Sequence, residues 1–314
     1  MLPAMALHVF PALVSVLLAT MLAGCSTPPP PFVQLSGLVI APQLDEISGL
    51  AASRVHPDTL WVLNDGGNAP ALYAIGKRGG LQATFRIAGV VNTDWEDLAA
   101  FDLGGRHYLL VADTGDNGGL RKTLQLHVVE EPQTHDDGMP HDGMLHDGIL
   151  RPAWSIAFRW PDGARDCEAV AVDAVRGEIL LISKRRRPPE LFTLPLRPGN
   201  GGLQVARLVG HLAGIPEPDA EALREDPHQA RIRNQVTAAD ISLDGRVIAV
   251  MTYRNVLVYP RPPHASWAQA LARNPQVHDL TWLPQAEALA WAADGHGLYA
   301  TGEHSPAPLL YLNP

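Results

Sequence analysis

The sequence predicts an all-β fold, a five-bladed β-propeller, because five short segments of the chain are nearly alike and recur at regular intervals. The segments are 48–51 (SGLA), 96–99 (EDLA), 168–171 (EAVA), 239–242 (ADIS) and 287–290 (EALA), and they begin about 48 or about 71 residues apart. A turn and a second apolar run follow each segment. Long repeats built from short strands are typical of propeller blades.

The strands can be assigned blade by blade, since each repeated segment is typical of an innermost strand with up to three strands after it. The expected strands are 47–51, 60–63, 71–75 and 82–87; 98–101, 108–112, 124–129 and 155–160; 169–172, 179–182, 191–196 and 204–211; 240–243, 247–251, 256–259 and an ill-defined strand before Leu280; and 288–291, 298–300 and 309–312. Glycine and proline, 28 of each, suit the tight turns between these strands.

The fifth blade lacks a fourth strand, and the apolar run 32–40 is a spare strand before the first blade. Pairing this N-terminal strand with the last blade would close the circle and remove its free edges. Six blades would need a further repeat within 197–236, a stretch rich in proline, aspartate and arginine with weak alternation. Five blades are therefore the preferred prediction, with six as the alternative.

Composition limits the partners that the chain can have. It contains 314 residues, of which 46% are apolar, and its formal net charge is −9. That length and apolar content suffice for a large core. No basic patch of the nucleic-acid type is present, which excludes a nucleic-acid partner. We expect a monomer.

The N-terminus is typical of an exported protein. Residues 1–24 are largely apolar and end in small residues, which indicates a signal peptide. Leu-Ala-Gly-Cys at its end resembles the bacterial lipobox, so Cys25 is the expected lipidation site and Ser26 favours the outer membrane, on its periplasmic or its surface side. The proline-rich stretch 25–32 is a stiff tether, and 33–314 forms a single propeller domain.

The alternative is an uncleaved membrane anchor, because residues 1–7 contain no lysine or arginine. If Cys25 carries lipid, Cys167 has no partner for a disulfide bond, and we expect it to be a small buried side chain.

Carboxylates recur at the start of the innermost strands and form a predicted ring. Glu96, Glu168 and Glu287 share this register with Ser48, and the expected metal ligands are these four residues. Converging carboxylates need a cation or must take up protons. Hard oxygen ligands favour Ca²⁺, with Mg²⁺ or Mn²⁺ as alternatives.

The fourth blade offers Ala239 at this register, so Thr237, Asp240, the backbone or water would have to complete the ring. The alternative is that the acids only line a water-filled channel.

The turns after the second strands should lie on the same face as this ring, since antiparallel strands alternate in direction. They are 64–68 (NDGGN), 113–117 (DTGDN), 184–187 (KRRR), 252–254 (TYR) and 303–304 (EH). The candidate bases are Asp65, Asp113 and Asp116; the candidate phosphate-binding residues are Lys184, Arg185, Arg186 and Arg254. The alternative is that these are ordinary polar turns.

Two further segments have alternative interpretations. Residues 135–148 contain three His-Asp units that each end in glycine (HDDG, HDG and HDG), which suggest either a transition-metal site or a duplicated loop on the face away from the ring. The charged stretch 214–235 lies on the ring's face and is either a lid or a solvated linker.

The pattern resembles the soluble calcium-activated nucleotidases (apyrases). The likeness lies in Ser48, in the strand that ends Asn64-Asp65-Gly66-Gly67, in Glu96, in Glu168 with the basic turn 184–187, and in Glu287. The resemblance implies a five-bladed propeller that hydrolyses nucleoside di- and triphosphates around a central Ca²⁺.

The chain departs from that family where Ala239 replaces a serine, Gly49 an acidic residue and Asn64 an aspartate. The runs 94–97, 114–117 and 236–240 look more like a broad set of secreted bacterial propellers of unassigned function.

Two functions therefore follow as hypotheses. The first is a Ca²⁺-dependent phosphohydrolase that acts on a phosphate-bearing, anionic small molecule. The second is a non-catalytic propeller with a structural metal, whose ring face binds a protein or glycan of the cell envelope.

Overall fold

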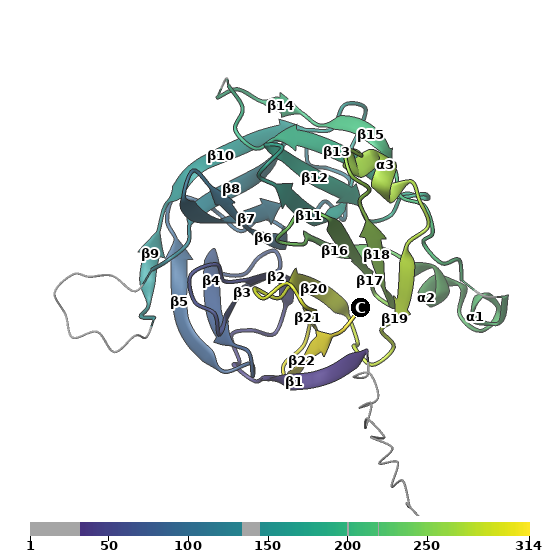
Figure 1. The fold of residues 1–314 in the computed structure, drawn as a ribbon, viewed down its shortest axis with the longest axis horizontal. Helices are drawn as coiled ribbons and strands as arrows, with labels where there is room; N and C mark the ends of the chain where they lie inside the picture. Colours follow the sequence, from purple (N-terminus) through teal and green to yellow (C-terminus); the bar gives the residue numbers. More distant parts are fainter. Residues whose placement is uncertain (1–31, 134–144, 200, 219) are drawn as a thin grey trace, which may run out of the picture. The chain divides into compact units, whose positions relative to one another are not determined.

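Five β-sheets of the chain surround a common axis, which confirms the five-bladed propeller (Figure 1). This computed structural model describes residues 32–133, 145–199, 201–218 and 220–314. Within its described residues, the stretch 197–236 adds the outer strands β14 (Gln204–Val205) and β15 (Arg207–His211) and the helices α1 (Ala220–Glu225) and α2 (Pro227–Ile232), with no sheet of its own. The alternative of six blades is therefore wrong.

Each blade runs outward from an innermost strand. The strands are β2 (Ile47–Ala52), β3 (Thr59–Asn64), β4 (Ala71–Gly76) and β5 (Leu81–Ile87) in blade 1; β6 (Trp95–Leu103), β7 (Arg106–Asp113), β8 (Leu124–Glu130) and β10 (Pro152–Arg159) in blade 2; β11 (Cys167–Asp173), β12 (Glu178–Ser183), β13 (Glu190–Pro195) and β15 (Arg207–His211) in blade 3; β16 (Val236–Ile241), β17 (Val247–Thr252), β18 (Asn255–Pro260) and β19 (Gln276–Asp279) in blade 4; and β20 (Ala286–Trp291), β21 (Leu298–Gly302), β22 (Ala307–Leu312) and β1 (Val33–Val39) in blade 5.

The circle closes as the sequence predicts, with the N-terminal strand in the last blade. β1 pairs antiparallel with β22, from Val33 opposite Leu312 to Val39 opposite Ala307. Two short strands add to neighbouring edges: β9 (Gly148–Leu150) runs parallel to β5, and β14 (Gln204–Val205) runs parallel to β10.

The core lies between the blades. The innermost strands β2, β11 and β20 are buried along their whole length, whereas the outer strand β5 alternates between buried and exposed residues. Five apolar clusters each join the sheets of two adjacent blades. Burial of apolar surface therefore stabilises every blade-to-blade contact.

A β-bulge at the start of every innermost strand fixes the register of the ring. The residues skipped in the pairing are Ser48, Glu96, Glu168, Thr237 and Glu287. The predicted register of blade 4, with Ala239 at the ring position, is therefore wrong by two residues. A shift of two leaves the same side chains on the same face of a strand, so the apolar pattern could not reveal it.

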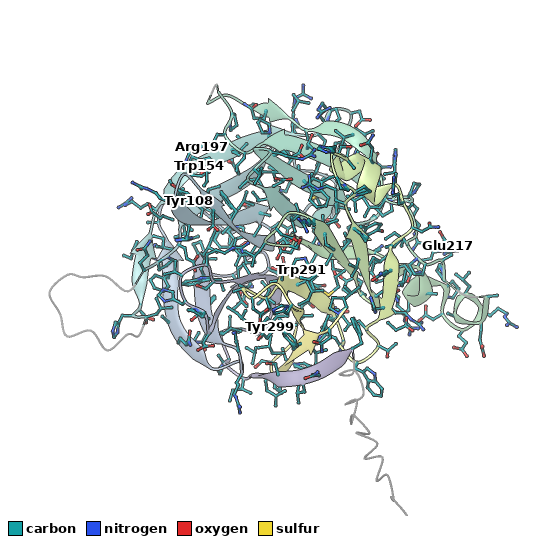
Figure 2. All side chains as sticks on the ribbon, in the orientation of Figure 1. Tyr108, Trp154, Arg197, Glu217, Trp291 and Tyr299 are labelled. Carbon is teal, nitrogen blue, oxygen red and sulfur yellow. The ribbon has the colours of Figure 1, made fainter. Side chains whose placement is uncertain are left out.

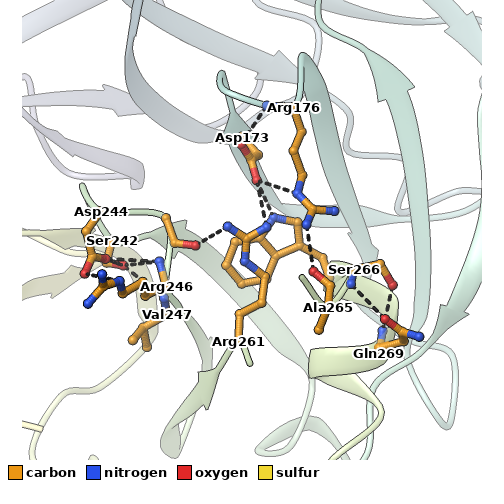
Figure 3. Close-up of polar contacts among 12 residues, drawn as sticks. Asp173, Arg176, Ser242, Asp244, Arg246, Val247, Arg261, Ala265, Ser266 and Gln269 are labelled. Atoms are coloured by element: carbon orange, nitrogen blue, oxygen red, sulfur yellow. Dashed lines mark hydrogen bonds and ion pairs between the residues drawn. The ribbon is translucent and has the colours of Figure 1, made fainter. Parts of the chain in front are cut away.

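Helix α3 (Trp267–Leu271) lies between β18 and β19 of blade 4 and packs on blades 3 and 4. It contacts the buried carboxylate of Asp173 in blade 3 (Figure 3). Trp267 Nε1 donates a 2.8 Å hydrogen bond to Asp173, and the Arg261 guanidinium lies 3.4 Å from the same carboxylate. Ser266 and Gln269 form a capping box at the start of the helix. These contacts hold the insertion between β18 and β19 against blade 3.

The innermost strands leave one backbone edge without a strand partner, and two aspartates accept hydrogen bonds from these edges. Asp97 of β6 accepts from the backbone N–H of Val170 in β11 at 2.8 Å and of Ala239 in β16 at 3.3 Å. Asp240 of β16 accepts from Trp291 of β20 at 2.8 Å, near the propeller axis (Figure 2). Four of the five blades are thus connected through carboxylates in the channel.

We expect Asp97→Ala to lower the free energy of unfolding by about 3 kcal/mol, because it leaves buried N–H groups of two other blades without an acceptor. Asp97→Asn keeps one acceptor oxygen and should lose less. Urea denaturation measures both. Asp102→Ala is the matched control on the same strand, since the Asp102 side chain is 56% exposed. Equal stability of the two alanine variants would contradict the role of Asp97.

Candidate metal centre

The predicted ring lies at one end of the channel, where the innermost strands begin, together with the turns that follow the second strands. We name this end the mouth and define it by Glu96, Glu168 and Glu287. Lys184, from the turn after β12, contacts Glu168, and Tyr253, from the turn after β17, donates a 2.6 Å hydrogen bond to Glu287. Two of the five turns predicted to lie at the ring, those after β12 and β17, thus contact it.

Two groups of acids within the described residues are compact enough to hold a metal ion. Asp65, Asp94 and Glu96 form one group, and Glu96, Asp166 and Glu168 form the other. In each group, one carboxylate oxygen per residue lies within 4.8 Å of the others. Oxygen atoms at about 2.4 Å on opposite sides of a Ca²⁺ ion lie about 5 Å apart, so both groups have suitable dimensions. Glu96 belongs to both.

Two glycines make room for these carboxylates. A Cβ atom on Gly66 would lie 2.6 Å from an Asp94 oxygen, and one on Gly115 would lie 2.6 Å from the Asp94 carboxylate and still closer to Glu96. Any larger residue would collide with the acids. The turns after β3 and β7 therefore approach the acids through bare backbone.

The fourth blade contributes a hydroxyl group at the ring register. The Thr237 side chain is buried, and its Oγ1 has no hydrogen-bond partner in the described part of the chain. Ser48, at the same register in blade 1, donates a 2.8 Å hydrogen bond to the Trp95 carbonyl. The ring register therefore holds oxygen-bearing side chains in all five blades, three of them carboxylates.

Lys184 is a buried cation of the protein's own, rather than part of an exposed basic rim. Its ammonium group donates to Glu168 and lies 5.2 Å from the centre of the Tyr253 ring. The chain of contacts continues from Tyr253 to Glu287. Lys184 balances one negative charge of the ring and leaves the others uncompensated.

Burial and mutual repulsion raise the pKa values of the acids at the mouth. Desolvation, followed by the nearby charge of Glu168, raises the pKa of Glu96 well above its usual range. Desolvation and Glu303 raise the pKa of Glu287 to about 8. For Asp65, desolvation is the main cause of a pKa of about 6. Groups that resist ionisation in this way are stabilised by a bound cation.

The other candidate bases are engaged in the local structure. Asp113 forms a 2.6 Å ion pair with Arg121. Asp116 accepts hydrogen bonds from the backbone N–H groups of Leu120 and Arg121, at 2.8 and 3.1 Å. Asp65, by contrast, belongs to one of the two groups of acids.

The arginines predicted to bind phosphate lie in two places. Arg185 lies 3.0 Å from Asp166 and Arg186 3.7 Å from Glu190, and both line a cavity of about 320 Å³ beside Asp166. Arg254 lines two other cavities, one between blade 4 and the helical segment that precedes it, and one at the junction of blades 4 and 5. Glu287 lies outside both compact groups of acids.

Sequence reasoning missed Asp94 and Asp166 as members of the acidic groups. Each lies two residues before a ring glutamate, so blades 2 and 3 share the pattern Asp-x-Glu at the same register. Side chains two residues apart point to the same face of an extended chain. That shared pattern was the available signal.

Some of the remaining predicted features lie in residues that the structure describes, and others do not. Cys167 is buried, and burial raises the pKa of its thiol, which agrees with an inert side chain. The signal peptide, Cys25 and most of the tether lie outside the described residues, as do residues 134–144 of the His-Asp-Gly insertion. None of the helices in the described ranges has the length and apolar character needed to cross a bilayer.

Comparison with known proteins adds no family. The chain matches no known protein family and no curated protein. One solved structure with a similar fold is that of a nidogen/laminin complex, at 13% identity and a TM-score of 0.41, covering 82% of this chain and 72% of that chain. Fold and site together define a β-propeller with an acidic cluster that could bind a metal ion.

We expect Lys184→Met to strengthen Ca²⁺ binding, because it removes a positive charge beside the acids. Repulsion between a monovalent and a divalent cation about 5 Å apart costs about 2 kcal/mol even in water, so the Kd should fall about tenfold or more. Titration calorimetry with Ca²⁺ measures this, with Lys122→Met as the control for an exposed lysine. Unchanged or weaker binding would contradict competition between Lys184 and the metal.

The metal-free protein should lose stability at the mouth as the pH rises. The pKa of Glu287 in the folded protein, about 8, exceeds its usual value of 4.5. The contribution of Glu287 to the free energy of unfolding is therefore fully present below about pH 4.5 and is lost as the pH rises through about 8. Glu287→Gln should flatten this part of the curve, whereas Glu130→Gln, at an exposed site, should not. Thermal melts from pH 5 to 9 measure it; identical pH profiles of wild type and Glu287→Gln would contradict the raised pKa.

Proposed function

We propose that this propeller binds a hard divalent cation, Ca²⁺ before Mg²⁺ or Mn²⁺, at its mouth and hydrolyses a phosphate-bearing small molecule there. The observation that supports the proposal is the position of Glu96, which belongs to two groups of acids whose oxygens lie within 4.8 Å of one another. The buried hydroxyl of Thr237 and the raised pKa values of the glutamates fit the same ion.

The residues around the ion would divide the work. A bound cation would supply a Lewis acid for phosphate oxygens. Asp65, with a pKa of about 6, is largely ionised at neutral pH and can accept a proton from water. Arg185 and Arg186 lie beside Asp166 on a cavity of about 320 Å³, where their guanidinium groups can hold phosphate oxygens.

A second candidate function is a non-catalytic propeller with a structural metal, whose mouth face binds a protein or glycan. The engagement of Asp113 with Arg121 and of Asp116 with backbone N–H groups favours it, because both acids stabilise turns. Fold alone does not decide between the two, since propellers host both kinds of function.

The N-terminal sequence favours a location at the bacterial outer membrane. We propose that Cys25 carries the lipid and that the proline-rich residues after it tether the propeller to this membrane. A monomer anchored in this way would present its mouth to small molecules of the envelope.

Purified protein should release phosphate from ADP or GDP at millimolar Ca²⁺ and not after EGTA. A thermal melt under the same conditions should show a Ca²⁺-dependent rise, since an ion that binds the folded state stabilises it. Glu96→Ala should abolish both effects, and Asp65→Asn should reduce turnover more than the thermal shift. Asp102→Asn, on the exposed part of β6, is the matched control.

The outcomes separate the two candidates. A thermal shift without phosphate release would favour the non-catalytic propeller. If Ca²⁺ did not raise the melting temperature of the wild type, or if it raised that of Glu96→Ala equally, the proposed metal centre would be contradicted.

A further inference from the structure

A second cavity lies between helix α2 (Pro227–Ile232) and the junction of blades 4 and 5. Its volume is about 510 Å³, within the range of small-molecule sites. It is lined by the end of α2, by the turn after β17 and by the loop between β19 and β20. Its lining includes Ile232, Arg233, Tyr253, Arg254, Leu280 and Leu283.

Two arginines give the cavity a positive charge. Arg233 and Arg254 line both this cavity and a smaller one of about 180 Å³ beside it. Within the described ranges, neither guanidinium group is paired with a carboxylate. Among the residues that the structure describes, no acidic one lines the larger cavity.

The acids that line the smaller cavity are engaged with other groups. Glu217, beside α2 in Figure 2, pairs with Arg187 at 3.3 Å. Asp279 accepts a 2.8 Å hydrogen bond from the Asn255 amide. Two arginines therefore line these cavities, while the nearby acids have partners of their own.

A buried polar atom at the smaller cavity is also without a partner. The Asn255 side chain is 3% exposed, and its Oδ1 makes no hydrogen bond in the described part of the chain. A buried acceptor of this kind normally meets a donor such as a water molecule. An anionic head group could not satisfy it, so we place the anion in the larger cavity, which Asn255 does not line.

The rest of the larger cavity is apolar enough to hold a hydrocarbon body. Ile232, which is half-buried, and Pro284, which is exposed, offer apolar surface to a ligand in the cavity. Leu280 and Leu283 are buried beneath the lining.

We propose that this cavity binds an organic anion, with its carboxylate or phosphate on Arg233 and Arg254 and its apolar body against Ile232 and Pro284. Guanidinium groups bind planar oxyanions through paired hydrogen bonds, which matches both head groups. The cavity adjoins the metal centre, because Tyr253 lines the cavity and its hydroxyl donates to Glu287. The residues proposed to hold the anion include none of the candidate metal ligands, so binding of the anion does not require the cation.

The test compares charged and neutral probes of the same shape on the full protein. Calorimetric titrations in EDTA use 2-naphthoate, 2-naphthyl phosphate and the neutral 2-naphthylmethanol. We expect saturable binding of one or both anions, at least tenfold tighter than that of the alcohol. The tighter anion identifies the head group. Equal binding of the alcohol, or no saturable heat from either anion at millimolar concentrations, would overturn the proposal.

Variants then locate the site. Arg233→Met and Arg254→Met should each weaken anion binding about tenfold or more, and Ile232→Ala should weaken the anions and the alcohol alike. Arg246→Met is the control, because Arg246 is 81% exposed and pairs with Asp244 (Figure 3). Thermal melts verify that each variant is folded. Equal weakening by Arg246→Met, or none by Arg233→Met and Arg254→Met, would overturn the proposal.

Discussion

The constraint on which this propeller depends is the free backbone edge that each innermost strand turns toward the axis. Every sheet has such an edge, and its N–H and C=O groups are shielded from bulk water. Asp97 and Asp240 accept hydrogen bonds from the edges of blades 3, 4 and 5. These carboxylates lie in a poorly solvated channel, where a negative charge is unfavourable. Desolvation by burial therefore raises the pKa of Asp97 well above its usual range. The same channel thus combines structural carboxylates with those of the mouth.

At the mouth, two effects reduce the repulsion between the clustered carboxylates. Lys184 neutralises part of the charge near Glu168, and protons on groups with raised pKa values neutralise more. If a divalent cation bound here, it would attract the carboxylates more strongly than Lys184 or protons do, so metal binding, proton release and movement of the Lys184 ammonium would be coupled.

Much of the fold could be predicted from the sequence, because repeat spacing and apolar patterning are local properties. The five innermost strands, the closing strand and the shared register of Glu96, Glu168 and Glu287 follow from them. The register of blade 4 did not, because Thr237 and Ala239 lie on the same face of one strand. The burial of Lys184 could not be predicted either, since it depends on Tyr253 from another blade. Turn chemistry likewise does not distinguish Asp116, which accepts from its own turn, from Asp65, which faces other acids.

The pairing of β1 with β22 also has a topological consequence. Because Val33 lies opposite Leu312, the first and last strands are neighbours in one sheet. The packing of the five sheets therefore does not require the chain to be broken between β22 and β1. A circularly permuted chain, joined across the present ends and opened at another surface turn, would contain the same strand pairs in the same order.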